Sequence, residues 1–367
     1  MDLHARIPQT TDAATFVARL TEDTPHDRDV LLVRGDPTFL RVGTTPSRDI
    51  QLPETLSYLR AGDIVRVNEG AGHIRVVYRR NSPHNVLFFT ERCNSRCLMC
   101  SQPPREIEDG YLIDEILEAI PLMSQETPEL YITGGEPTLL GDRLLEVIEA
   151  TKRHLPDTSL HMLSNGRLFR YMRLAQEIAE IRHPNFMIGI PLYSDIASKH
   201  DFVVQAKGAF DETVRGIMNL ARVGQRIETR FVIHRQTFSR LAHTARFIAG
   251  NLPFVDQVAL MGLEMTGLTK ANLEALWIDP IEYQPELREA VEEFRRARVP
   301  VMIYNHQLCL LDKDLWPIAR KSISDWKNVY MPECISCRIK DQCGGFFASA
   351  HLRYSKHITP VGGPAMP

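Results

Sequence analysis

Three closely spaced cysteines indicate the chemistry that this chain can perform. Cys93, Cys97 and Cys100 stand at a C-x3-C-x2-C spacing, directly after the apolar run 86–89, which predicts a buried strand. A loop this short can present three thiolates to one [4Fe-4S] cube, which normally takes four. No fourth cysteine lies within the next thirty residues, so we expect one iron to stay open. An open iron can chelate the amino and carboxylate groups of a methionine moiety, as S-adenosylmethionine (SAM) offers.

The other four of the seven cysteines lie near the end of the sequence. Cys334, Cys337 and Cys343 form a C-x2-C-x5-C clip, and Cys309 lies upstream. Four thiolates can close a second metal site, and an iron–sulfur cluster and tetrahedral zinc both suit that number. His306 could compete as a ligand, and we favour Cys309.

The placement of the cysteines and the overall composition indicate the cellular compartment of the protein and the kinds of partner it can bind. Thiols gathered in two clusters, in a chain whose N-terminus has no secretory signal, indicate metal in a reducing cytoplasm rather than a disulfide framework. Hydrophobic residues make up 44% and charged residues 24% of the 367 residues, which is ordinary globular usage. A formal charge of -3 gives no reason to expect nucleic acid as a partner. The apolar runs are too short to cross a membrane.

Strand and helix patterns alternate over residues 85–263. Apolar strand patterns occupy 86–90, 129–133, 159–163, 186–190, 227–233 and 257–261, with amphipathic helical stretches between them. Six such repeats predict an α/β fold, a partial (β/α)6 barrel of the TIM type with helices outside. In such sheets the chemistry lies at the carboxyl ends of the strands.

Two smaller regions flank this barrel. Residues 1–84 predict a small antiparallel β-rich module, with strands 29–34 and 39–42 joined by a turn at 35–37 and a hairpin of strands 63–67 and 73–78. The module could guide a peptide by strand addition, although a cap over apolar edges is the simpler interpretation. Residues 264–367 carry the second cysteine group and form the third predicted region.

Short or polar residues follow several predicted strands. Gly134 and Gly135 would let the backbone approach a ligand closely, and Glu136 and Pro137 come next; the same run can also be a plain turn with proline at a helix start. The remaining candidates at strand ends or on strands are Ser164, Asn165, Ser194, Arg230, His234 and Met261. A lone histidine such as His234 is more often structural than catalytic, and Arg230 could pair with a carboxylate or form a salt bridge.

The cysteine loop, followed one βα unit later by Gly134-Gly135-Glu136-Pro137, resembles the radical SAM superfamily. The resemblance implies a catalytic cluster on Cys93, Cys97 and Cys100, with SAM cleaved to a 5'-deoxyadenosyl radical. It also implies SAM contacts from a set of residues along the strand ends: Met99, Gly134, Gly135, Glu136, Pro137, Ser164, Asn165, Ser194, Arg230 and Met261. Met99 departs from the family, which usually has an aromatic residue there.

The C-terminal clip resembles the SPASM and twitch extensions of that superfamily. This likeness implies one auxiliary [4Fe-4S] cluster on Cys309, Cys334, Cys337 and Cys343. Its expected role is electron transfer from a product radical.

Segments 87–104, 201–219, 261–280 and 305–347 resemble the C-type radical SAM maturases of His-Xaa-Ser peptide systems, as does the block 322–327. Met265 departs from this pattern, because proline is expected there. The resemblance implies a ribosomally made precursor peptide as substrate, a second radical SAM maturase as a possible partner, and an electron donor of the flavodoxin or ferredoxin type.

Three other functions remain open at this point. A radical SAM enzyme could act on a small molecule or a nucleotide. A non-enzymatic iron–sulfur carrier or sensor would not need the nucleoside-binding motifs at the strand ends. A zinc-stabilised binding module would leave the three-cysteine loop one ligand short.

Overall fold

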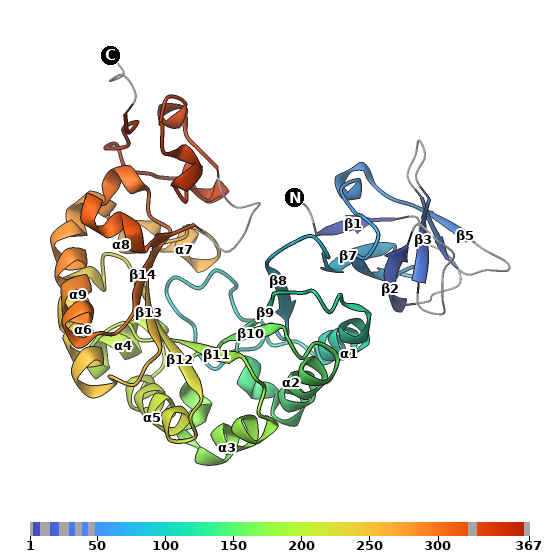
Figure 1. The fold of residues 1–367 in the computed structure, drawn as a ribbon, viewed down its shortest axis with the longest axis horizontal. Coiled ribbons are helices and arrows are strands. Elements are labelled where there is room, and N and C mark those ends of the chain that lie inside the picture. Colours follow the sequence, from blue (N-terminus) through green and yellow to red (C-terminus); the bar gives the residue numbers. More distant parts are fainter. Residues whose placement is uncertain are drawn as a thin grey trace.

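Two β-sheets organise the molecule (Figure 1). The computed structural model describes residues 3–7, 15–21, 29–33, 39–42, 48–321 and 329–362. The larger sheet is parallel throughout and has the order β15-β14-β13-β12-β11-β10-β9-β8. Its strands are β8 (Asn85–Phe88), β9 (Glu129–Thr133), β10 (Ser159–Leu163), β11 (Phe186–Pro191), β12 (Arg226–Ile233), β13 (Gln257–Gly262), β14 (Val301–Tyr304) and β15 (Ala319–Arg320).

This curled sheet confirms the predicted partial barrel. All six expected strands are present, and β14 and β15 extend the sheet by two more. The added strands come from the region after residue 264, so the barrel sheet continues beyond the predicted boundary. The division into three domains stays a prediction.

Helices cover the convex face of the barrel sheet (Figure 1). The α-helices of the described residues are α1 (Tyr111–Ala119), α2 (Asp142–His154), α3 (Met172–Ile181), α4 (Ala197–Val204), α5 (Ala209–Arg222), α6 (Leu241–Asn251), α7 (Leu268–Ala271), α8 (Leu273–Leu276) and α9 (Gln284–Ala297). Of these, α4, α7 and α8 contact the cysteine loop. In α2 the buried residues Leu144, Val147, Ile148 and Thr151 recur at helical spacing, so one stripe packs on the sheet. None of the helices in the described ranges has both the length and the apolar character of a membrane span.

Side chains alternate between the two faces of each barrel strand. In β10, Leu160 and Met162 belong to the core under the helices, whereas His161 lines the barrel lumen. The lumen therefore receives polar residues even from strands whose sequences are largely apolar.

The N-terminal sheet has the order β1-β7-β6-β2-β3-β4-β5. Its strands are β1 (His4–Arg6), β2 (Thr15–Thr21), β3 (Asp29–Val33), β4 (Phe39–Val42), β5 (Arg48–Gln51), β6 (Ile64–Asn68) and β7 (His73–Tyr78). The predicted hairpin is present as β6 and β7. The sheet is antiparallel except where β2 pairs with β3 in parallel, which differs from a purely antiparallel module. The predicted turn at 35–37 lies outside the described residues.

Polar contacts join this module to the first barrel helix. Arg66 of β6 and Arg75 of β7 both form ion pairs with Glu115 of α1. The Tyr78 hydroxyl lies 2.8 Å from Thr127 Oγ1 in a buried hydrogen bond. The module is therefore held against the β8 side of the barrel.

Candidate active site

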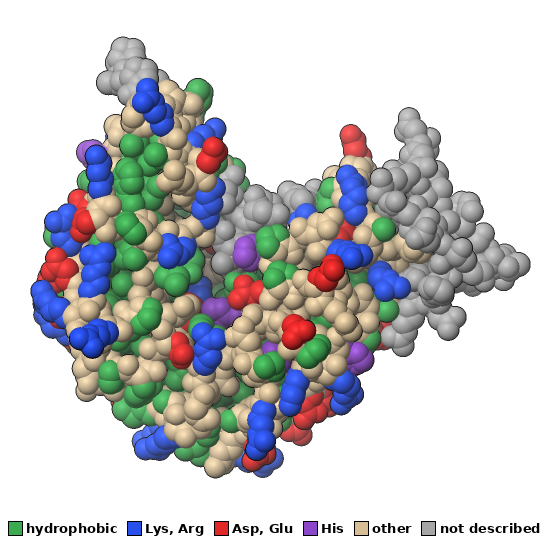
Figure 2. Space-filling model, viewed as in Figure 1, with side chains coloured by type: hydrophobic (Ala, Val, Ile, Leu, Met, Phe, Trp, Pro, Cys, Tyr) green, Lys and Arg blue, Asp and Glu red, His purple; other side chains and the backbone are tan. Residues whose placement is uncertain are grey.

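The three cysteines of the first group line one large cavity. It fills the barrel lumen, has a volume of about 1440 Å³, and is lined by Cys93, Cys97 and Cys100 as well as by residues of β7 in the N-terminal sheet. Figure 2 shows the surface hollowed between the C-terminal region and the N-terminal module. A ligand in the lumen can thus reach the cysteine loop and the module together.

The glycine pair after β9 holds the start of the cysteine loop. Gly135 N donates to Thr90 O at 2.7 Å, and Glu136 N donates to Arg92 O at 2.9 Å. A Cβ on Gly135 would lie 2.1 Å from Arg92 O, so only glycine allows this approach. The two glycines therefore pack against the cysteine loop whatever further role they have in cofactor binding.

Glu136 ties two strand ends together from a fully buried position. Its carboxylate accepts hydrogen bonds from Thr138 N, Thr138 Oγ1, Ser164 Oγ and Asn165 N. Burial raises the pKa of Glu136, and these hydrogen bonds oppose that rise. The carboxylate fixes the Ser164–Asn165 step beside the cysteines, where the Asn165 amide lies 4.0 Å from Cys93 Sγ.

The loop after β13 holds the far end of the cysteine loop. Leu268 N donates to Cys100 O at 2.8 Å, Thr269 Oγ1 donates to Met99 O at 3.2 Å, and Asn272 Nδ2 donates to Leu98 O at 2.8 Å. A Cβ on Gly267 would lie 2.2 Å from Cys100 O. Sequence reasoning missed these contacts, because their only local signal is a Thr-Gly step after a strand.

Two charged residues complete the hold on the cysteine loop. Asp109, fully buried, accepts from Thr90 Oγ1 at 2.8 Å and from Glu91 N at 2.6 Å. Arg167 Nη1 donates to Ser95 Oγ at 3.1 Å. Neither residue was predicted, since an isolated Asp-Gly or an arginine after a strand carries no specific signal.

The three thiols sit in surroundings that disfavour a bare thiolate. Burial raises the pKa of Cys93 to about 11 and that of Cys97 to about 12, and it also raises the pKa of Cys100. At neutral pH the metal-free thiols are protonated, so a bound cation has to displace those protons.

The donor set fits a [4Fe-4S] cluster with one open iron. Three thiols lie on one cavity that has room for a further ligand. In the described part of the chain, no three His, Cys, Asp or Glu side chains converge on a point where one ion could bind. A cubane cluster does not require such convergence, because each thiolate binds a different iron.

The predicted SAM-binding residues divide into two sets. Those that line the cavity are Met99, Gly134, Gly135, Ser164, Asn165, Arg230 and Met261. Glu136, Pro137 and Ser194 do not line it. Ser194 is buried, and its Oγ accepts a hydrogen bond from Ile196 N at 3.1 Å, just before the start of α4. His234 is fully buried outside the lumen and accepts from Gln236 N at 3.2 Å.

Arg230 already has an anionic partner within the protein. Its Nη1 donates to Glu228 Oε1 at 2.6 Å, and its Nη2 donates to Met261 Sδ at 3.2 Å. From the sequence, Arg230 could pair with a ligand carboxylate or form a salt bridge within the protein. The structure contains the salt bridge.

The second cysteine group also gathers around one cavity. Cys309, Cys334, Cys337 and Cys343 all line a space of about 20 Å³. Leu308 N donates to Cys343 Sγ at 3.5 Å. The donor set suits iron–sulfur and zinc alike by ligand type.

His306 has both ring nitrogens engaged. Nε2 lies 2.8 Å from the Tyr283 hydroxyl, and Nδ1 lies 2.8 Å from Tyr304 O. Among the candidate fourth ligands, Cys309 is the one that faces the other thiols.

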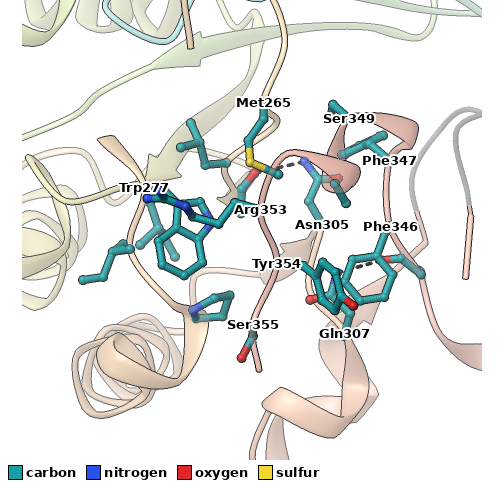
Figure 3. A pocket seen from close by; sticks show the side chains of 18 of the residues that line it. Met265, Trp277, Asn305, Gln307, Phe346, Phe347, Ser349, Arg353, Tyr354 and Ser355 are labelled. Atoms are coloured by element: carbon teal, nitrogen blue, oxygen red, sulfur yellow. Dashed lines mark hydrogen bonds between the residues drawn. The ribbon is translucent and has the colours of Figure 1, made fainter. Parts of the chain in front are cut away.

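A small pocket of about 70 Å³ lies where the C-terminal region meets β13 and β14 (Figure 3). Met265 lines it, the Arg353 guanidinium lies 5.2 Å above the Trp277 ring, and Phe346 meets Tyr354 edge to face. These contacts pack the second cysteine region onto the barrel. The block 322–327 lies outside the described residues.

Residues 87–248 match the model of the Radical SAM superfamily. Among curated proteins, Fe-coproporphyrin III synthase of Methanosarcina barkeri (strain Fusaro / DSM 804) is 29% identical over 167 residues, which is 45% of this chain and 40% of that protein. The chain thus aligns with less than half of the length of this relative.

Solved structures show low identity over longer spans. Streptococcus suis SuiB bound to precursor peptide SuiA is 14% identical over 61% of this chain and 49% of that chain, with a TM-score of 0.48. A radical SAM methyltransferase from Sphaerobacter thermophilus is 13% identical over 75% of this chain and 76% of that chain, with a TM-score of 0.46. Identities this low carry neither substrate nor reaction over to this chain.

Proposed function

We propose that the whole chain is a radical SAM enzyme that modifies a ribosomally made peptide of the His-Xaa-Ser type, since residues 87–248 match the model of the Radical SAM superfamily. Cys93, Cys97 and Cys100 would hold the cluster. When bound, that cluster supplies the electron that cleaves SAM to a 5'-deoxyadenosyl radical, which abstracts a hydrogen atom from the substrate. The cytoplasm is the proposed compartment, with a flavodoxin or ferredoxin type electron donor and a second radical SAM maturase as proposed partners.

One observation carries the peptide proposal. The cavity of about 1440 Å³ joins the cysteine loop to β7 of the N-terminal sheet. Small-molecule sites usually measure roughly 300–1,000 Å³, so this lumen has room for several linked residues of an extended chain. The N-terminal sheet would guide the peptide, and the barrel walls would exclude water from the reacting atoms.

The chain's own residues supply the positioning. Gly134, Gly135 and the Ser164–Asn165 step lie beside the cysteine loop, where a nucleoside ligand of the cluster would have to be held. Glu136, which does not line the cavity, would act through Ser164 and Asn165. Cys309, Cys334, Cys337 and Cys343 would hold an auxiliary cluster, for which zinc is the competing occupant.

The decisive test of the enzyme is anaerobic reconstitution followed by iron, sulfide and zinc analysis and a dithionite-driven assay for 5'-deoxyadenosine. Two cubane clusters predict about eight irons per chain. The triple change of Cys93, Cys97 and Cys100 to alanine should abolish SAM cleavage. The triple change of Cys334, Cys337 and Cys343 should spare cleavage without substrate and stop product formation. Identical behaviour of the two variants would refute this division of roles.

A second candidate is a radical SAM enzyme acting on a small molecule. The curated relative, whose name states a porphyrin product, favours it. Mass spectrometry of a His-Xaa-Ser repeat peptide incubated with the reconstituted chain and SAM separates the two. Release of 5'-deoxyadenosine without a mass change in the peptide would count against the peptide proposal.

A further inference from the structure

Three hydrogen-bond donors in the barrel lumen have poor acceptors or none. Arg230 Nη2 points to Met261 Sδ at 3.2 Å, and the Tyr304 hydroxyl points to Met302 Sδ at 3.4 Å. A thioether sulfur is a weak acceptor. These two donors therefore retain most of their capacity to bind an oxygen atom.

The third group is a histidine nitrogen without a partner, which is a donor in the tautomer that carries the proton on Nε2. His161 is 8% exposed and lines the lumen, and its Nε2 makes no hydrogen bond within the described residues. Glu228 Oε1 lies 3.6 Å from it, which is beyond hydrogen-bond distance. A buried polar atom without a partner destabilises a protein unless a ligand satisfies it.

The three side chains lie near one another in the lumen, because the charge of Arg230 acts on both His161 and Tyr304. They come from β10, β12 and β14 and line the same cavity as the cysteine loop. A Cβ on Gly189 of β11 would lie 3.0 Å from both His161 Nε2 and Arg230 Cδ, so glycine leaves room for these side chains. Tyr131 stacks on the His161 ring with centroids 5.4 Å apart and fixes its plane.

The charges that line this part of the lumen favour a neutral carbonyl oxygen over a carboxylate as the acceptor for these donors. Of the acidic and basic residues that line the cavity, those on the barrel strands are Glu129, Glu228, Arg226 and Arg230, so acids and bases balance on these strands. The Glu228 carboxylate already accepts from Arg230 Nη1 and from Gln257 Nε2. An added carboxylate would meet no excess positive charge, whereas a neutral carbonyl oxygen would take the three donors without a charge to bury.

We propose that Arg230, Tyr304 and His161 form a subsite for a neutral carbonyl oxygen of the substrate, as in a peptide bond or a carboxamide side chain. The proposal deepens the peptide function above and rests on it. The subsite lies in the lumen, within the cavity that the cysteine loop shares, so it would set which substrate segment lies near the radical source.

The test uses three isosteric probes on the anaerobically reconstituted full chain. Dissociation constants of propionamide, propionate and propylammonium are measured by ligand-observed NMR. Propionamide should bind at least about threefold more tightly than either charged probe. Tyr304→Phe and His161→Phe should each weaken propionamide binding by about three- to tenfold, the loss expected for one hydrogen bond. The exposed Tyr171→Phe change is the matched control and should leave binding unaltered.

Several outcomes would overturn the subsite. One is tighter binding of propionate or propylammonium than of propionamide, and another is no binding of propionamide to the folded wild type. The others are equal propionamide binding by the wild type and both lumen variants, and a larger loss of SAM affinity than of propionamide affinity in those variants. Circular dichroism melts establish that each variant folds. The 5'-deoxyadenosine assay on the same samples reports separately on the enzyme proposal, which can fail while the probe preference stands.

Discussion

Two features of Gly267 require glycine: its positive φ and its close contact with the cysteine loop. Gly141 has the first feature without the second, so the two effects can be compared. The Gly267 φ of 53° lies in the left-handed region, and a Cβ there would lie 2.2 Å from Cys100 O. Gly141 has nearly the same φ, 54°, with nothing within 4 Å of an added Cβ. The two glycines share backbone strain and differ in contact with the cysteine loop.

Gly267→Ala should therefore damage the metal site more than Gly141→Ala. Both changes add left-handed strain of about 1–2 kcal/mol, and Gly267→Ala also displaces the backbone of Cys100. We expect Gly267→Ala to lower the iron retained per chain after anaerobic desalting, with Gly141→Ala close to the wild type. Equal iron retention would show that the contact with Cys100 does not hold the loop.

Glu136→Gln tests the buried link between Glu136, Ser164 and Asn165. The change keeps the size of the side chain but turns one acceptor oxygen into a donor that faces the donors on Thr138, Ser164 and Asn165. We expect a loss of about 1–3 kcal/mol in the free energy of unfolding together with weaker SAM binding, measured by thermal melts and titration. Unchanged values for both would mean that these groups rearrange freely.

At the scale of elements, the contact of β6 and β7 with α1 rests on one carboxylate. Glu115 is 7% exposed and pairs with Arg66 and Arg75. Glu115→Ala would leave two half-buried arginines without their partner and should lower the free energy of unfolding by about 3 kcal/mol. Faster proteolysis between the module and the barrel should accompany the loss.

The control for this change is Arg173→Ala. Arg173 forms an exposed pair with Glu177 one helical turn away, and such pairs contribute about 0.3–0.5 kcal/mol. If both variants unfolded alike, the ion pairs of Glu115 would not be what holds the module.

The sequence predicts elements well where a local pattern is complete. The β6–β7 hairpin has alternating strands around a glycine-containing turn, and the six predicted barrel strands, β8 to β13, have apolar runs next to amphipathic helices. In contrast, β15 has two residues and becomes recognisable only through pairing with β14. The prediction also missed β14, although it has four residues, as many as the predicted β8.

The site was predictable where chemistry depends on residue type and spacing. Cys93, Cys97, Cys100 and Gly134–Gly135 could be found in this way, and the structure places them on one cavity. The contacts from Gly267, Thr269 and Asn272 could not, because their partners lie about 170 residues earlier and no local pattern encodes such a pairing.

At the scale of the whole molecule, buried histidines set the response to acid. Burial lowers the pKa of His161, His200 and His306 to about 4 and that of His234 to about 3. The unfolded chain takes up these protons near pH 6.5, whereas the folded chain does so only near pH 3–4. Stability is therefore complete above about pH 6.5 and falls as the pH drops towards 4, by on the order of 1–3 kcal/mol per histidine.

Urea unfolding between pH 4.5 and 7.5 measures this effect. His234→Gln removes one of the titrating groups and should flatten the acid side of the stability profile. The exposed His243→Gln change should follow the wild type. If the stability of His234→Gln changed with pH in parallel with that of the wild type, the His234 ring would be protonated to the same extent in the folded and unfolded states.

The contacts between the cysteine loop and distant segments of the chain have a consequence for folding during synthesis. Met99 and Leu98 are bonded by residues 170 and 174 positions further along the chain, so a ribosome must release the polypeptide well past residue 272 before the loop takes its shape. Contacts of such long sequence separation form late in folding. Iron delivered to the nascent chain would meet an unshaped loop, and insertion of the proposed cluster would therefore follow completion of the barrel.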